Sequence, residues 1–163
     1  MTEKPSILFS ITSCKRLDLF KRTVNSFLNS CEDLSLISEW ICVDDNSSKE
    51  DRDEMLRFYP FINFIFKGEK QKGHPESMNI IRERALEHDY LLHLEDDWTF
   101  TVRKPYVNVA LHIMEQKEEY MQVVFNRNYS EELKPNNVDV IGGFKKRTGK
   151  GVYYVEHEFY PKG

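Results

Sequence analysis

Short apolar runs alternate with helical segments through the first 130 residues of the chain. This alternation constrains the fold more than any other feature, because parallel strands need crossover helices to return the chain to the same edge of a sheet. We expect strands at 6–11, 40–43, 61–66, 90–94 and 121–125, and helices at 18–28, 49–58, 75–88 and from 105 onward. Asp18 is a candidate N-cap for the first helix. The predicted fold class is α/β, with a mostly parallel sheet flanked by helices.

After residue 129 the pattern becomes less regular. Two further predicted strands, 138–144 and 152–159, lie on either side of a turn rich in Gly and Lys at 145–151. Two strands that flank a short glycine-containing turn are typical of an antiparallel hairpin. We therefore expect a short, irregular and antiparallel C-terminal part.

Length and composition fit one globular domain, since 163 residues with 40% hydrophobic content suffice for a single core. The net charge of −4, from 23 basic and 27 acidic residues, argues against a general polyanion binder, so we expect no nucleic-acid partner. Cys14, Cys31 and Cys42 are odd in number and lack metal-ligand spacing, which favours a reduced, cytoplasmic setting. The chain shows no cleavable signal pattern and no apolar segment of ~20 residues, so we expect no transmembrane segment.

Three consecutive acids, Glu95, Asp96 and Asp97, directly follow the predicted buried strand 90–94. In an extended segment, residues two apart point the same way, so Glu95 and Asp97 share a face and Asp96 points away. Adjacent carboxylates repel one another unless a cation offsets their charge, and Mg²⁺ or Mn²⁺ prefers such oxygen ligands together with substrate phosphates. This pattern predicts a metal–diphosphate site with Asp97 and Glu95 as ligands. The alternative is a solvated acidic turn, which leaves three acids after a buried strand unexplained.

Two other loops follow predicted strand ends, and a doubly wound sheet gathers such loops at one edge. Thr12 and Ser13 offer hydroxyls that can cradle a base, although for this loop alone a helix-entry turn with capping hydroxyls is the favoured explanation. The loop lacks glycine, so it is neither a dinucleotide fingerprint nor a P-loop. Asp44 and Asp45 can accept hydrogen bonds from a base N–H or a ribose hydroxyl. Their alternative role is an Asx-turn and helix cap, and one of the two acids can cap while the other binds.

The polar loop 67–74 lies between these places in the sequence. Lys72 or Lys70 can provide a positive charge for a diphosphate. The simpler interpretation of these lysines is that they belong to a solvated loop. Asn79, near the start of the following helix, can face the same edge of the sheet. We expect His93 to be a strand histidine whose ring nitrogens have hydrogen-bond partners, rather than a ligand.

Taken together, these motifs resemble a glycosyltransferase of the GT-A fold, closest to the large inverting family 2. The resemblance spans about residues 5–130 and depends on the order and spacing of motifs that are individually short. They are Thr12-Ser13-Cys14-Lys15, Val24-Asn25-Ser26-Phe27-Leu28, Val43-Asp44-Asp45-Asn46-Ser47-Ser48, Ser77-Met78-Asn79 and Leu94-Glu95-Asp96-Asp97. The last stands in the place of the family's DXD motif.

The resemblance implies a Rossmann-like sheet that binds a nucleotide-diphospho-sugar donor, preferably UDP-linked, together with Mn²⁺ or Mg²⁺. By position, Thr12 and Asp45 would contact the base and Asp44 would lie beside the ribose. Asp96 and Asp97 would address the ribose and the metal, with Asp97 the favoured ligand. The expected organisation is a single domain, 1–163, with a donor part at 1–130 and a contracted or truncated acceptor part at 131–163. The acceptor, whether glycan, protein or small molecule, is not indicated.

An inverting transferase also needs a carboxylate base for the acceptor hydroxyl. Only 66 residues follow Asp97, fewer than an acceptor-binding half usually occupies in the family, and their candidate acids are Asp139, Glu156 and Glu158. We leave the base unassigned. Two alternatives are a binding-only or truncated transferase and a nucleotidyltransferase. A nucleotidyltransferase would normally have a glycine-rich phosphate loop near the first strand, and this chain has none there. A receiver-like domain would need a phosphorylatable acid after residue 66, where the chain has Lys67-Gly68.

Overall fold

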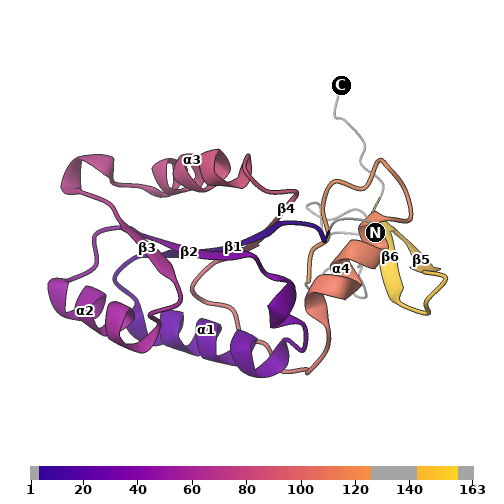
Figure 1. Ribbon diagram of the computed structural model, residues 1–163, viewed down its shortest axis with the longest axis horizontal. Coiled ribbons are helices and arrows are strands. Elements are labelled where there is room, and N and C mark those ends of the chain that lie inside the picture. Colours follow the sequence, from indigo (N-terminus) through magenta and orange to yellow (C-terminus); the bar gives the residue numbers. More distant parts are fainter. Residues whose placement is uncertain (1–3, 126–142, 158–163) are drawn as a thin grey trace, which may run out of the picture. The chain divides into compact units, whose positions relative to one another are not determined.

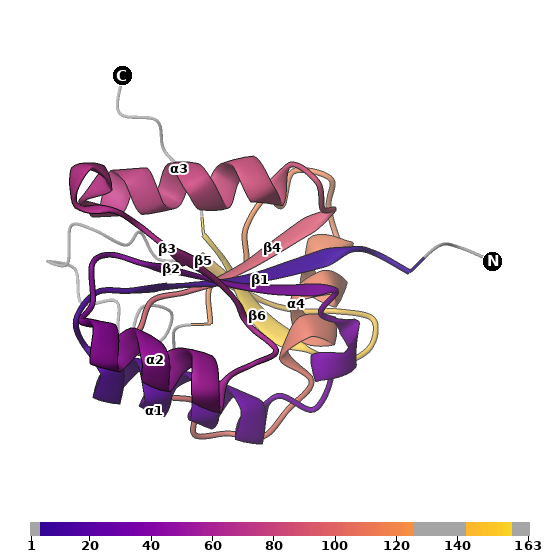
Figure 2. The same cartoon turned by 60° about the vertical axis from the view of Figure 1, so that its left-hand side comes forward.

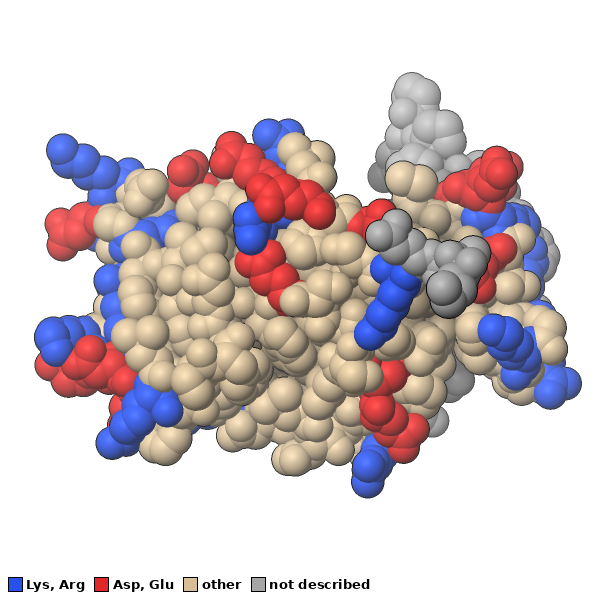
Figure 3. Space-filling model, viewed as in Figure 1, with Lys and Arg blue, Asp and Glu red and all other residues tan. Residues whose placement is uncertain are grey.

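The computed structural model describes residues 4–125 and 143–157 of the chain. The chain divides into two compact units, Met1–Pro105 and Tyr106–Gly163. The expected boundary near residue 130 lies outside the described residues. The face seen in Figure 3 carries basic and acidic side chains interspersed among uncharged ones.

The first unit is a parallel sheet between two layers of helix, as predicted (Figure 1). Its elements are β1 (Ile7–Ser13), α1 (Leu17–Ser30), β2 (Glu39–Asp44), α2 (Lys49–Phe58), β3 (Asn63–Phe66), α3 (His74–Ala85) and β4 (Tyr90–Leu94), with short 3₁₀ turns at Leu34–Leu36 and Glu69–Gln71. The four strands are all parallel, in the order β3-β2-β1-β4. The helices α1 and α2 cover one face of the sheet and α3 covers the other (Figure 2).

Burial explains why β1 and β2 lie at the centre of the sheet. The apolar side chains of β1 are at most 2% exposed, as expected for a strand covered on both faces. On the α3 side, Leu8, Ile41, Val43 and Ile81 form one apolar cluster. On the other side, the ring of Phe9 stacks on that of Phe27, a residue of the buried face of α1. The sheet therefore holds the carboxyl ends of its strands in fixed register.

Helix boundaries follow local capping chemistry only in part. The predicted range of α2 is confirmed, and Ser48 caps it by accepting a hydrogen bond from Asp51 N at 3.0 Å. The predicted cap of α1 is wrong, since the helix starts at Leu17 and Arg16 occupies the N-cap position without a side-chain bond. Asp18 lies inside the first turn, where its charge complements the helix dipole instead.

The second unit contains α4 (Tyr106–Met114) and an antiparallel pair, β5 (Gly143–Arg147) and β6 (Tyr153–His157). The helix after residue 105 and the antiparallel pairing are thus confirmed, while 138–142 and 158–159 of the predicted strands lie outside the described residues. The strand predicted at 121–125 is wrong: this segment is irregular, and Met121 and Val124 are exposed. None of the helices in the described segments combines the length and hydropathy that a membrane crossing requires.

Candidate functional site

A cleft of about 290 Å³ lies at the carboxyl edge of the first unit's sheet. The loops after β1, β2 and β4 line it together with the start of α3, and the side chains are those of Thr12, Ser13, Cys14, Arg16, Asp45, His74, Ser77, Glu95 and Asp96. Open α/β sheets bind ligands at this edge. A second hollow, of about 430 Å³, lies along the hairpin turn 147–151 of the second unit, and its lining contains no carboxylate side chain.

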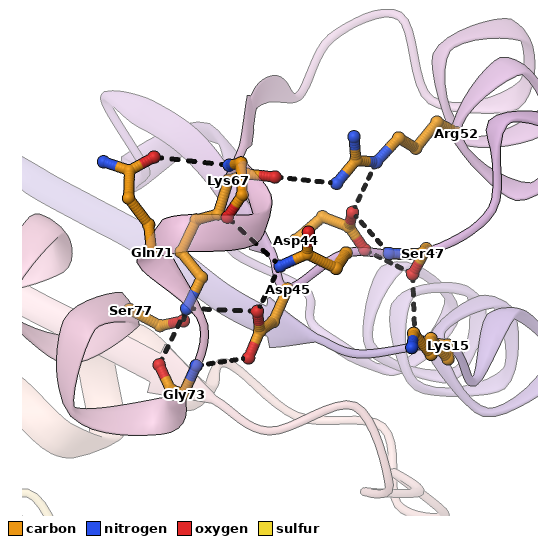
Figure 4. A network of polar contacts seen from close by, with 11 residues as sticks. Lys15, Asp44, Asp45, Ser47, Arg52, Lys67, Gln71, Gly73 and Ser77 are labelled. Carbon is orange, nitrogen blue, oxygen red and sulfur yellow. Dashed lines mark hydrogen bonds and ion pairs between the residues drawn. The ribbon is translucent and has the colours of Figure 1, made fainter.

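The two adjacent acids at the end of β2 have different surroundings (Figure 4). Asp44 is fully buried; its Oδ1 accepts from Ser47 Oγ at 2.5 Å, and its Oδ2 accepts from Ser47 N at 3.1 Å and Arg52 Nε at 2.8 Å. Its oxygens are thus taken by the turn that starts α2. Asp44 does not line the cleft, so the geometry does not support its predicted place beside a ribose.

Asp45 lines the cleft, and three neighbouring groups contact its carboxylate. Its Oδ2 accepts a hydrogen bond from Gly73 N at 2.9 Å, and its Oδ1 accepts one from Asn46 Nδ2 at 2.8 Å and lies 3.4 Å from Lys67 Nζ. Burial alone would raise the pKa of Asp45, but the hydrogen bonds from Asn46 and Gly73 and the charge of Lys67 outweigh it and lower that pKa. Asp45 is therefore an ionised acceptor at neutral pH.

Lys67 is a site residue that the sequence reasoning missed. Its side chain is fully buried, and its ammonium group donates to Gly73 O at 2.7 Å and Ser77 Oγ at 2.8 Å. The structure pairs Asp44 with Phe66, so the residues that follow them, Asp45 and Lys67, lie side by side, and the sequence alone does not give this register.

In the acidic run Glu95 and Asp97 are exposed and Asp96 is only 1% exposed. Residues 96–97 form a turn rather than an extended segment, so the predicted shared face of Glu95 and Asp97 is not confirmed. The inward residue, Asp96, lines the cleft together with Glu95, whereas Asp97 lies outside its lining. Asp96 Oδ1 pairs with Arg16 Nη2, and its Oδ2 accepts from Cys14 N at 3.4 Å. Burial raises the pKa of Asp96, and the guanidinium of Arg16 offsets this only in part. Asp96 thus anchors the loop after β1.

Arg16 was also missed, and it is the cation nearest to the acidic run among the described residues. Besides its contact with Asp96, its Nη1 lies 3.6 Å from Asp97 Oδ2. The side chain is 48% exposed. Nothing in the sequence distinguishes it from Lys15, its neighbour.

The hydroxyls at the end of β1 lie at the cleft. Thr12 and Ser13 both line the cleft. Ser13 is 2% exposed, and its Oγ has no hydrogen-bond partner within the described part of the chain. Because buried hydroxyls are nearly always satisfied, this oxygen is a place where a polar ligand atom would be stabilised.

Two predicted residues of the α3 region lie elsewhere. Lys72 and Asn79 are exposed and do not line the cleft; His74 and Ser77 take that place. Asn79 follows Ser77 by two positions, and residues two apart in a helix face different directions, so Asn79 does not face the cleft that Ser77 lines. His93 is satisfied as predicted, with its Nδ1 at 2.9 Å from Ser10 Oγ, and burial lowers its pKa.

No family model and no curated protein matches this chain.

The described residues contain no group of three His, Cys, Asp or Glu side chains arranged to hold a metal. Glu95 and Asp97 nevertheless offer two exposed carboxylates beside the cleft. Mg²⁺ is commonly bound through one or two carboxylates completed by substrate phosphates and water. Carboxylates are the ligand type that such a cation prefers, and Asp97 also lies 3.6 Å from Arg16 Nη1.

The candidate bases belong to the second unit. Glu156, in β6, forms ion pairs with Lys117 and Lys146. Asp139 and Glu158 lie outside the described residues. No base is assigned.

Proposed function

We propose that the chain is a metal-dependent glycosyltransferase of GT-A type that takes its sugar from a nucleotide-diphosphate donor, UDP-linked by preference. One observation carries this proposal: the carboxyl ends of three strands far apart in the sequence line one cleft through Thr12, Asp45 and Asp96. Their order along the chain is that of the family motifs they resemble. Inversion at the sugar carbon is part of the proposal by resemblance only.

Each side chain has a role that its surroundings support. Asp45, an ionised acceptor, would bind an N–H of the base, and the hydroxyls of Thr12 and Ser13 would complete the nucleoside contacts. Asp96 would orient the loop after β1 and contact the ribose. Asp97 and Glu95 would hold Mn²⁺ or Mg²⁺. A bound cation would supply stabilisation of the charge that grows on the diphosphate leaving group.

The first prediction is that UDP with Mn²⁺ raises the melting temperature of the protein. At a ligand concentration of 100 times Kd, binding adds about 2.7 kcal/mol to the stability, which corresponds to a shift of several degrees. Asp97→Ala should abolish this shift. Asp53→Ala is the matched control, because Asp53 is a similarly exposed acid of α2 outside the cleft. An unchanged shift in Asp97→Ala, with UDP and Mn²⁺ present, would count against the proposed metal ligand.

A working transferase and a binding-only domain differ in a second measurement. A working enzyme slowly hydrolyses its donor when water replaces the acceptor, so UDP should accumulate from a UDP-sugar over hours. Binding without any UDP release would favour the binding-only alternative. Formation of UTP and a sugar 1-phosphate, when inorganic pyrophosphate is added to the UDP-sugar, would favour the nucleotidyltransferase alternative.

A further inference from the structure

The hairpin formed by β5 and β6 is basic in a chain that is acidic as a whole (Figure 1). Residues 143–157 include four basic residues and one acidic residue, Glu156, whereas the whole chain has a net charge of −4. The proposed function uses none of these residues. Because neighbouring cations repel one another, the partners of these side chains decide what the hairpin can bind.

The one acid of the hairpin is already engaged with other cations. Glu156 forms ion pairs with Lys146 of β5 and with a lysine outside the hairpin. Within the part of the chain that the structure describes, no carboxylate pairs with Arg147 or Lys150. The Nζ of Lys150 lies 2.9 Å from Nε2 of His112, which is an imidazole rather than a carboxylate. Two cations at the turn therefore lack an anionic partner among the described residues.

Both of these side chains are exposed and line the hollow of about 430 Å³ at the turn 147–151. Thr148 closes the turn: its amide donates to Val152 O at 2.8 Å, and its Oγ1 accepts from Val152 N at 3.1 Å. The backbone amides of Gly149 and Lys150 have no acceptor among residues 4–125 and 143–157. The hollow thus presents side-chain cations and backbone donors together.

The guanidinium of Arg147 is held in place by two neighbours. Its Cζ lies 5.1 Å from the centre of the Tyr153 ring, a cation–π contact across the two strands. Gly151 has a φ of 86°, and a Cβ at this position would lie only 3.2 Å from Arg147 Nη2. Glycine therefore leaves room for the guanidinium against the turn. A guanidinium that is already positioned loses less freedom when it binds a ligand.

The chemistry of the turn favours a phosphate group as its ligand. A guanidinium donates two parallel hydrogen bonds to a phosphate, and a lysine beside it adds a second positive charge. A phosphate monoester carries a charge of about −1.5 to −2 at pH 7 and has three acceptor oxygens, so it matches two cations better than a singly charged carboxylate does. No carboxylate of the lining would repel such a ligand.

We propose that the turn 147–151 is a binding site for a phosphate monoester, held by Arg147 and Lys150. The inference goes beyond the proposed function, because it uses no residue of the nucleotide cleft. The phosphate can belong to a soluble metabolite or to a lipid headgroup such as that of phosphatidic acid. The chemistry at the turn is the same in both cases, and the experiment separates the two sources.

The test follows the backbone amides of Gly149 and Gly151 by ¹⁵N NMR in the full chain. Inorganic phosphate, glycerol 3-phosphate and, as a carboxylate probe, acetate are added separately at constant ionic strength. The variants are Arg147→Gln and Lys150→Gln, and the control is Lys49→Gln, which removes an 81% exposed cation of α2 outside the hollow. Co-sedimentation with phosphatidylcholine vesicles, with and without phosphatidic acid, tests the lipid source.

We expect millimolar phosphate and glycerol 3-phosphate to shift both glycine amides, and acetate to bind at least about fivefold more weakly. Arg147→Gln and Lys150→Gln should each weaken phosphate binding roughly tenfold, whereas Lys49→Gln should leave it unchanged. Co-sedimentation that requires phosphatidic acid and is lost in Arg147→Gln assigns the phosphate to a lipid. Amide shifts without such co-sedimentation assign it to a soluble ligand.

Three results would overturn the inference: glycine amides that do not respond to either phosphate probe, equal affinities for acetate and phosphate, or equal phosphate affinities in the two turn variants and the control. The ligand-free spectra of the variants show whether the turn is intact. Because the experiment needs neither UDP nor Mn²⁺, its outcome is independent of the proposed function.

Discussion

Asp44 and Asp45 are chemically identical neighbours, and only their surroundings give them different roles. Asp44 accepts from Ser47 and Arg52 in the interior, so it stabilises the turn into α2. Asp45 accepts from Gly73 and pairs with Lys67, and it also lines the cleft. A neutral side chain at either position would leave a buried donor without its acceptor, which typically costs about 1–3 kcal/mol.

At this scale we predict that Asp45→Asn destabilises the protein by about 1–3 kcal/mol at pH 7. The pKa of Asp45 is lowered in the folded state, so its charge stabilises the fold above the ordinary Asp pKa of 3.8 and this contribution is lost as the pH falls through the lowered value. Urea unfolding of both proteins between pH 7 and pH 3 measures the difference, which should shrink only below about pH 4. A difference that is constant over the whole range would contradict the assigned ionisation.

Among the elements, the start of α3 is the part that depends most on a single backbone conformation. Gly73 lies at the N-cap position with φ 109° and ψ 150°, and Pro75 follows in the first turn. In this conformation the amide of Gly73 donates to Asp45, so one residue couples the start of α3 to the acid that lines the cleft. The buried Lys67 also contacts the start of α3, because its ammonium group donates to the carbonyl oxygen of Gly73.

We predict that Gly73→Ala destabilises the protein by about 1–3 kcal/mol, because a side chain is strained in this backbone region. The added Cβ would meet nothing closer than Pro75 Cδ at 3.7 Å, so the cost arises from the backbone rather than from crowding. Gly68→Ala, in the same loop at φ −81°, is the control and should be nearly neutral. Equal stability losses in the two variants, measured by urea unfolding, would show that the Gly73 conformation is not required.

For the whole molecule, the sequence predicted the parallel α/β sheet because each strand and helix carries its own periodic signal. It also predicted that the acids and hydroxyls after the strands meet at one edge, since strand ends of a parallel sheet meet there. Thr12, Ser13, Asp45 and Asp96 do line the cleft, whereas Asp44 and Asp97 do not. It did not predict Arg16 or Lys67, because their importance arises from partners 80 and 22 residues away. The sequence also predicted Lys72 and Asn79 at the site, whereas His74 and Ser77 are the residues of α3 that line the cleft.

The central claim is that one nucleotide binds across the loops after β1, β2 and β4 with a cation at the acidic run. A crystal of the full chain soaked with UDP and Mn²⁺ tests it most directly. We predict the uracil beside Thr12 and Asp45, and the diphosphate and Mn²⁺ beside Glu95 and Asp97. Anomalous scattering from manganese at another place, or UDP bound away from Asp45, would contradict the claim.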